Sequence, residues 1–308
     1  MSGFLLGWAA AIPAYATPLL LAALGLLLSE RAGVLNLSPE GVMAIGAVTG
    51  AAVVLNGVDP SLGIVAGIAA GAALSLVFAV VVVVFRADQT LAGLTTVAVG
   101  IGLAGVLGRP YVQQPFEGIE RFGAGAAPAT SAVGRFLHQQ DPLIPLALCL
   151  VVAVWWFLER TQAGLRLRAV GEDPGAADLA GVDVQLTRIA AVVTAGALCG
   201  LSGAYLSVAA SHVWVEGMIA GRGWIAVALV IFARWDPRRA LLGAIVFGSA
   251  EALGPRLQAI GAPIPTYLMM MLPYALTLAV LVLSSLVGRR ESAEPAALGS
   301  VYLRQDKQ

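Results

Sequence analysis

The chain has 308 residues, of which 59% are hydrophobic and 12% are charged, and its mean hydropathy is +0.87. Soluble proteins carry about 25% charged residues, so this composition predicts a protein that crosses a membrane several times. The 18 basic residues balance the 18 acidic ones, which leaves no surplus to bind nucleic acid. The single lysine, Lys307, precedes Gln308, whereas a P-loop needs lysine before serine or threonine. The chain is therefore not expected to hydrolyse nucleotides itself.

The first apolar run is interpreted as a retained membrane span rather than a signal peptide. Ala14-Tyr15-Ala16 resembles a cleavage site, but the first charged residue is Glu30, so the basic start of a signal peptide is missing. A helix needs about 20 apolar residues to cross a bilayer. We expect an all-α fold, a polytopic bundle of about nine transmembrane helices (eight to ten, since some runs are short). The candidate spans are 4–28, 36–56, 62–85, 90–108, 142–158, 186–210, 222–235, 240–254 and 266–287.

The basic residues indicate an orientation, because short cytoplasmic loops retain more of them. With the N-terminus outside and the C-terminus inside, 13 of the 18 basic residues lie on the cytoplasmic side. The five left outside are Arg109, Arg121, Arg135, Arg222 and Arg256. Residues 1–287 then form a transmembrane domain with an outer loop at about 109–141 and a cytoplasmic segment at about 160–185. Residues 288–308 form a polar cytoplasmic tail with nothing evident to pack against.

Glycines recur every four residues in several spans, as at Gly63, Gly67 and Gly71. Such spacing lets helices approach closely in lipid, so it predicts a tight bundle. The run Gly100–Gly105 matches the pattern GxGxxG, but a dinucleotide site needs a strand before it. We therefore interpret this run as packing too.

Polar residues interrupt the apolar sequence at three places where a pathway or gate could lie. Between the first two spans, Asn36, Ser38 and Glu40 surround Pro39, which disfavours helical geometry at Ser38. The segment is either a tight loop at the inner interface or a broken helix lining a pathway.

The second place is the turn at residues 86–90, where Gln89 is a pathway candidate. Thr95 follows it and is a weaker candidate, because its hydroxyl can bond to its own helix. Glu251 lies inside a short span and needs a partner or water, which makes it a functional candidate. The third place is residues 212–223 at the expected outer end. There, an extracellular gate or docking surface and a solvated loop are both open.

The cytoplasmic segment contains signals for a short helix. Asp173 suits the N-cap, Pro174 the first turn and Gly181 the position after the helix. A short capped helix between two spans is well shaped to lie in a groove on a soluble partner.

Several motifs resemble the permease subunits of bacterial ABC importers of the ribose and branched-chain amino-acid type, over roughly residues 15–287. The runs Gly164–Gly181 and Gly196–Tyr205 resemble this type in general. Two further motifs resemble most the nucleoside and simple-sugar group: Ser29–Asn36 with Glu40-Gly41, and Gly217–Ala228. The chain differs from the usual sequence of that group at two places. Members often have glycine at the position of Ser38 and lack Pro39, and they commonly have an asparagine in the region of Thr95-Thr96-Val97. Substrate preference could therefore differ.

The resemblance implies a function and a set of partners. The short helix would be the coupling helix that docks on a separate ATPase, with Asp173, Pro174, Ala177, Asp178 and Gly181 carrying the contact. The chain would be a non-enzymatic transport subunit in the bacterial inner membrane and would bind no cofactor, since ATP and magnesium belong to the ATPase. Its partners would be that ATPase, a second permease (related or identical), membrane lipid and a periplasmic or lipid-anchored substrate-binding protein.

Three alternatives remain open. A branched-chain amino-acid or pentose permease would differ only in substrate. An ion-coupled secondary transporter would use Glu40 and Glu251 as coupling groups. An intramembrane enzyme is disfavoured, because the acids are dispersed and only two histidines are present, so no nucleophile and base are evident.

Overall fold

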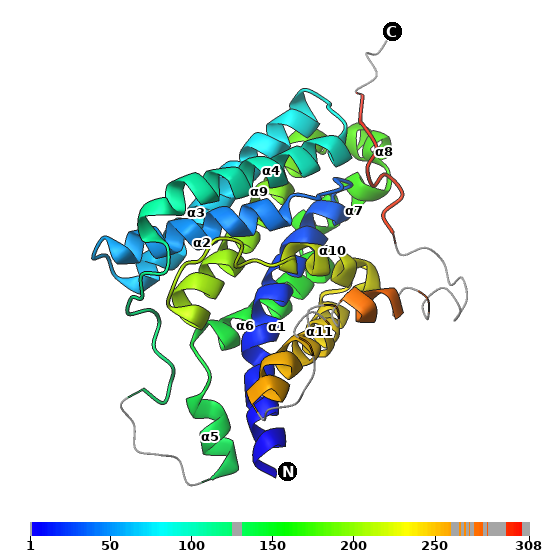
Figure 1. Ribbon diagram of the computed structural model, residues 1–308. Helices are drawn as coiled ribbons and strands as arrows, with labels where there is room; N and C mark the ends of the chain where they lie inside the picture. The colour runs from blue at the N-terminus through cyan, green and yellow to red at the C-terminus, as the bar shows by residue number, and fades with distance from the viewer. Residues whose placement is uncertain are drawn as a thin grey trace.

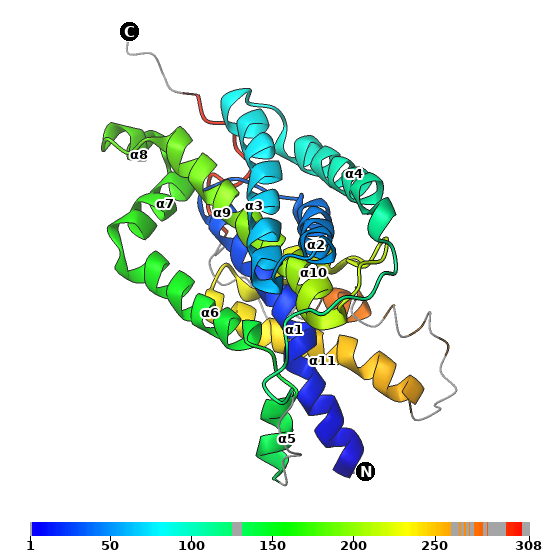
Figure 2. The ribbon, with the colours of Figure 1, turned by 90° about the vertical axis from the view of Figure 1, so that its left-hand side faces the viewer.

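The computed structural model describes residues 2–124, 131–259, 265, 268, 271, 274–279, 282 and 294–303. These residues form helices and connecting segments, with one isolated bridge between Val112 and Trp214. Figures 1 and 2 show the helices gathered in one bundle. The α-helices are α1 (Ser2–Arg31), α2 (Pro39–Leu55), α3 (Pro60–Ala79), α4 (Gln89–Gly108), α5 (Ala132–His138), α6 (Leu143–Arg160), α7 (Gln162–Glu172), α8 (Pro174–Leu179), α9 (Val184–Ala204), α10 (Arg222–Ala233) and α11 (Pro237–Ala259). Two π-helical turns, Val80–Val84 and Tyr205–Ser211, continue α3 and α9, and a 3₁₀ turn, Arg109–Tyr111, follows α4.

The described residues contain six helices that are long and apolar enough to cross a membrane. Two apolar helices, α2 and α10, are shorter. Each predicted span up to residue 254 corresponds to one of these helices, and α11 extends the predicted run 240–254 at both ends. The last predicted span, 266–287, lies largely outside the described residues. The total of about nine spans stays a prediction.

The glycine-rich faces form the tightest helix contacts, as their spacing predicts. A Cβ atom on Gly46 of α2 would collide with the backbone of Gly200 in α9, and one on Gly71 of α3 would collide with Gly196. A Cβ atom on Gly100 of α4 would likewise lie only 2.5 Å from the carbonyl oxygen of Gly41. These helices approach closely because no side chain separates them, and the GxGxxG run is part of this packing.

The connection between α1 and α2 is a buried, non-helical segment inside the bundle. Residues 32–37 leave the helical conformation, and all but two of them are buried. Near one end of the segment, the Glu30 carboxylate accepts a hydrogen bond from Trp235 Nε1, just past the end of α10 (2.6 Å). At its other end, Glu40 contacts the first residues of α10. The segment therefore runs beside the full length of α10, about 18 Å for twelve helical residues.

The burial of this segment is compatible with the broken-helix interpretation, because irregular backbone inside a membrane is tolerated where protein buries it. The depth of the segment in the membrane stays a prediction. One detail of the sequence prediction is wrong: Ser38 has φ −89° and ψ −5°, in the helical region. Pro39 occupies the first turn of α2, and the departure from helical geometry lies in residues 32–37 instead.

The two ends of the bundle carry different elements. The helix α5 and the first turns of α1 lie at one end, and α7, α8 and the described C-terminal residues lie at the other, as both views show (Figures 1 and 2). The expectation that the tail has nothing to pack against is wrong for residues 294–303. Ala297, for example, is 7% exposed and donates its N–H to Gly171 O (2.9 Å).

Candidate functional site

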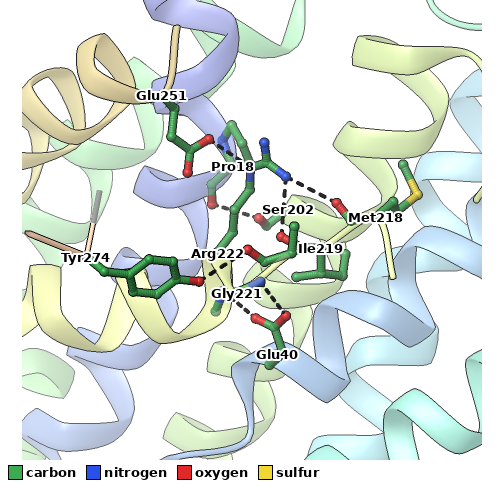
Figure 3. Close-up of polar contacts among 11 residues, drawn as sticks. Pro18, Glu40, Ser202, Met218, Ile219, Gly221, Arg222, Glu251 and Tyr274 are labelled. Carbon is green, nitrogen blue, oxygen red and sulfur yellow. Dashed lines mark hydrogen bonds and ion pairs between the residues drawn. The ribbon is translucent and has the colours of Figure 1, made fainter. Parts of the chain in front are cut away.

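A polar cluster joins α2, α10 and α11 in the interior of the bundle (Figure 3). Glu40, in the first turn of α2, accepts hydrogen bonds from Gly221 N through Oε1 and from Gly223 N through Oε2, both at 2.8 Å. The side chain therefore caps the N-terminus of α10, where unpaired N–H groups and the helix dipole favour a negative charge. Gly221 has φ +83°, a left-handed conformation that favours glycine.

Arg222 and Glu251 form an ion pair beside this cap. Arg222 Nε lies 3.0 Å from Glu251 Oε2, and the side chains are 19% and 9% exposed. Arg222 Nη1 also donates to the carbonyls of Met218 (3.1 Å) and Ile219 (3.3 Å). The cluster thus holds two carboxylates and one guanidinium, and the positive end of α10 offsets the second carboxylate. Glu251 has the partner that its position in a span requires.

Two neighbouring contacts bring further elements to the cluster (Figure 3). Tyr274 Oη donates to Ala220 O at 3.3 Å, in the turn that precedes α10. Ser202 Oγ of α9 donates to Pro18 O of α1 at 2.7 Å. The start of α10 is therefore surrounded by several helices.

One sequence prediction about this region is wrong. The sequence places residue 222 at the outer end and residue 40 near the inner interface, yet Gly221 and Glu40 share a hydrogen bond. The reason is length: α10 has only 12 residues, fewer than the roughly 20 needed to cross a bilayer, so its first turn lies inside the bundle.

The other pathway candidates lie near α2 but do not all join the cluster. Asn36 Oδ1 accepts from both the backbone N (3.0 Å) and the hydroxyl (2.6 Å) of Ser38, and both residues are buried. Gln89 Oε1 accepts from Leu35 N at 2.7 Å, which ties α4 to the same segment. Thr95 is exposed and donates to Leu91 O of its own helix. Thr95 is therefore apart from the others, and its pathway role stays a prediction.

A cavity of about 500 Å³ adjoins the Arg222 side chain. It lies between α1, the turn Tyr205–Ser211 and α11, and Arg121 and Gln139 of the 109–141 segment also line it. This volume is in the range of small-ligand sites. Guanidinium and amide groups in its wall can donate hydrogen bonds to a polar solute.

Within the 109–141 segment, residues 113–119 pack against residues 208–214. Gln113 N donates to Trp214 O (2.9 Å) and Phe116 N donates to His212 O (3.1 Å). Trp214 is 3% exposed, so the solvated-loop interpretation does not hold for it. Nearby, Asp141 accepts from Tyr205 Oη (3.0 Å), and burial raises the pKa of the Asp141 carboxyl.

The short helix α8 lies at the opposite end of the bundle from this segment and has the predicted caps. Asp173 Oδ1 accepts from Ala176 N (2.9 Å), Pro174 occupies the first turn and Gly181 has φ +83°. Ala177 is 4% exposed and packs against Val170 and Val184. The opposite face is open, since Leu179 is 82% exposed. The helix is thus anchored on one side and free on the other.

Sequence reasoning missed two buried charged residues, one near the end of α1 and one near the start of α9. Glu30 is 2% exposed, and Arg188 of α9 is 4% exposed. Arg188 donates through Nε to Ala32 O (3.3 Å) and through Nη1 to Ser300 O (3.0 Å). The available signal was the position of Arg188 inside an apolar run, where a charged residue needs polar partners.

The six long apolar helices of the described residues, together with the shorter α2 and α10, define a multi-pass membrane protein. The chain belongs to the family described as "Branched-chain amino acid transport system / permease component", whose model matches residues 9–281. It is therefore a permease subunit of an ABC transporter in the plasma membrane, and ATP hydrolysis belongs to a separate subunit.

Several relatives match almost the whole chain. A Haloferax volcanii protein named as a candidate glucose ABC transporter permease, TsgC13, is 41% identical over 94% of this chain and 95% of its own length. The guanosine ABC transporter permease NupQ of Bacillus subtilis is 34% identical, over 94% of each chain. The nucleoside ABC transporter permease NupC of Lactococcus lactis is 36% identical, also over 94% of each chain.

Proposed function

We propose that this permease imports a nucleoside or a simple sugar. The observation that carries the proposal is the similarity of the chain, over 94% of its length, to permeases named for glucose, guanosine and nucleosides. A cavity of about 500 Å³ with arginine and glutamine in its wall is compatible with a small polar solute. The family description, which names branched-chain amino acids, makes such an amino acid the second candidate.

The substrate assignment is tested through the substrate-binding protein that serves this permease. We expect its thermal midpoint to rise with nucleosides or hexoses and to stay unchanged with leucine, isoleucine and valine, since a ligand stabilises the state that it binds. Uptake of the hit by proteoliposomes that hold the assembled permease pair and its ATPase, supplied with the binding protein, should require ATP. A shift with branched-chain amino acids alone would contradict the assignment.

In the proposed mechanism, ATP binding closes two ATPase subunits, which move α8 on each of two paired permeases. The pair then alternates between inward-facing and outward-facing states, and a periplasmic or lipid-anchored binding protein delivers solute at the end that carries the 109–141 segment. The N-terminus is outside and the C-terminus inside, which the distribution of 13 of 18 basic residues favours. The chain binds no cofactor or nucleic acid itself, and a related permease or a second copy completes the pair.

The helix α8 is proposed as the coupling helix, and its cap offers a direct test. Asp173→Ala removes the side chain that accepts from Ala176 N, at a cost of about 1 kcal/mol to the helix. We expect about fivefold weaker recovery of the ATPase with the purified permease. Gly181→Val should act similarly, because Gly181 has a left-handed φ of +83°.

A control variant and a surface variant separate the cap from the docking surface. Asp173→Ser retains a capping oxygen and should restore ATPase recovery. Leu179→Glu places a charge on the exposed face, where Leu179 is 82% exposed, and should weaken docking while membrane insertion and thermal stability are unchanged. Normal ATPase recovery and normal transport in all three changed variants (Asp173→Ala, Gly181→Val and Leu179→Glu) would refute the assignment of α8.

Asn36, Ser38, Glu40, Gln89 and Glu251 are proposed to hold the pathway closed or to line it. What supports this role is the burial of the first four residues around the non-helical segment and the start of α10, and the ion pair of Glu251, whose side chain is 9% exposed. Thr95 remains a weaker candidate, because its hydroxyl bonds to its own helix.

A further inference from the structure

The described C-terminal residues form a turn that is bound to the bundle beside α8. We name residues 295–303 the C-terminal clasp. Ala297 N donates to Gly171 O of α7 (2.9 Å), and Gly299 N donates to Gly33 O between α1 and α2 (3.2 Å). Just before this contact, Ala296 N donates to the carboxylate of Glu172 (3.2 Å). The clasp therefore bonds to two different elements through its backbone.

The two acceptor elements touch each other at glycines. A Cβ atom on Gly171 would collide with Arg31 O, and Gly33 has φ +83°. Because neither residue has a side chain, the last turn of α7 lies directly on the start of the α1–α2 segment. The clasp binds both sides of this contact, since Ala297 N donates to Gly171 O and Gly299 N donates to Gly33 O. Figure 1 shows the C-terminal segment beside α7 and α8.

A buried arginine depends on the clasp for part of its hydrogen bonding. Arg188 Nη1 donates to Ser300 O (3.0 Å), and Gln89 Nε2 of α4 donates to the same oxygen (3.4 Å). Within the described residues, no carboxylate lies at ion-pair distance from Arg188. A buried charge without polar partners is costly. The carbonyl oxygens of Ser300 and Ala32 therefore stabilise the buried guanidinium of Arg188 by accepting its hydrogen bonds.

The clasp also reaches the buried side of α8. Tyr302 packs against the small apolar cluster of Val170, Ala177 and Val184, which anchors α8 to α7 and α9. Leu298 packs against the main core of the bundle. One short segment thus contacts α7, the cluster beneath α8, α9, α4 and the α1–α2 segment.

From these contacts we infer that the C-terminal clasp is a transmission element, which makes α8 and the α1–α2 segment move as one body. The inference rests on the proposed docking of the ATPase on α8. A displacement of α8 would then be carried through Tyr302, Gly171 and Gly33 to the non-helical segment, whose far end holds Glu40 at the start of α10. Without the clasp, only the direct contact of Gly171 with Arg31 and Gly33 would join α7 to this segment, so we expect ATPase movement to reach α8 but to transfer less efficiently to Glu40.

The test uses the assembled transporter in proteoliposomes and compares two truncations. A chain that ends at Glu294 lacks the clasp, whereas one that ends at Leu303 keeps it. We expect the first to retain ATPase recovery and ATP hydrolysis while solute imported per ATP hydrolysed falls about fivefold or more. The second should match the full chain. An unchanged ratio of transport to hydrolysis in the chain that ends at Glu294 would overturn the inference.

A point variant keeps the inference testable if that truncated chain does not fold. Ala297→Pro removes the N–H that donates to Gly171 O, and Ala297→Ser retains it as the matched control. We expect the same drop in transport per ATP for the proline variant alone. Equal ratios for the two variants would overturn the inference.

Loss of ATPase recovery in Ala297→Pro would also overturn it, because the clasp would then belong to the docking surface. Failure of the proposed coupling role of α8 gives a different pattern: Asp173→Ala and Leu179→Glu would leave ATPase recovery unchanged, whatever the clasp variants do.

Discussion

Arg222→Ala is expected to lower the free energy of unfolding by about 3–5 kcal/mol, because the Glu251 carboxylate loses its counter-charge in a buried position. Glu251 is 9% exposed at the side chain, so water solvates it poorly. The same change frees the carbonyls of Met218 and Ile219, to which Arg222 donates. The measurement is the midpoint of thermal unfolding of the purified permease in detergent, together with ATP-dependent uptake.

A double variant distinguishes a role of the Arg222–Glu251 ion pair in transport from a role in stability alone. Arg222→Met combined with Glu251→Gln removes both charges and should recover most of the lost stability, since no unpaired charge remains. If the ion pair serves transport, uptake stays low in this stable variant. If the pair is only structural, uptake returns with stability. A thermal midpoint of Arg222→Ala equal to that of the unchanged protein would contradict the buried ion pair itself.

Glu40→Ala is expected to have the second largest effect, because it leaves the N–H groups of Gly221 and Gly223 without acceptors. Each buried unsatisfied donor costs about 1–3 kcal/mol. Glu40→Gln keeps one carbonyl oxygen, so it should recover about half of the loss. The thermal midpoint of all variants would be measured under one detergent condition, and uptake below the lowest midpoint.

Thr95→Ala is the matched control for this series. Thr95 is an exposed pathway candidate whose hydroxyl bonds to Leu91 O of its own helix, so its loss should change stability by less than about 0.5 kcal/mol. Gly223→Ala should instead resemble Glu40→Ala, because a Cβ atom there would lie 2.6 Å from the Glu40 Cα. Equal stability of Glu40→Ala and Thr95→Ala would show that Glu40 does not cap α10.

Glu40 connects the start of α10 with the segment that leads toward α7 and α8, where the ATPase is proposed to dock. The carboxylate fixes the start of α10, while the backbone on its N-terminal side runs back past α10 toward Gly33 and α7. Movement at α8 therefore has a short structural route to the start of α10. In an alternating transporter, such a route lets a cytoplasmic event change the interior of the bundle.

The features that were predictable from the sequence are local or periodic. Apolar run length places the six long apolar helices and the shorter α2 and α10, because each backbone must satisfy its own hydrogen bonds in lipid. The caps of α8 follow from Asp173, Pro174 and Gly181, whose effects act within one turn. Glycine spacing predicts close helix packing, since residues four apart share a face.

Tertiary structure alone decides the pairings between distant residues. Glu40 meets Gly221 across 181 positions, Arg222 meets Glu251 from a neighbouring helix, and the C-terminal clasp covers Gly33 and Gly171. A charged residue in an apolar run signals that it needs a partner, but its partner depends on helix order and depth, which the apolar pattern does not specify. The composition thus determined that the protein is a membrane bundle with few charged residues, each costly to bury unpaired. The packing of α2, α10 and α11 determined which partners these charged residues have.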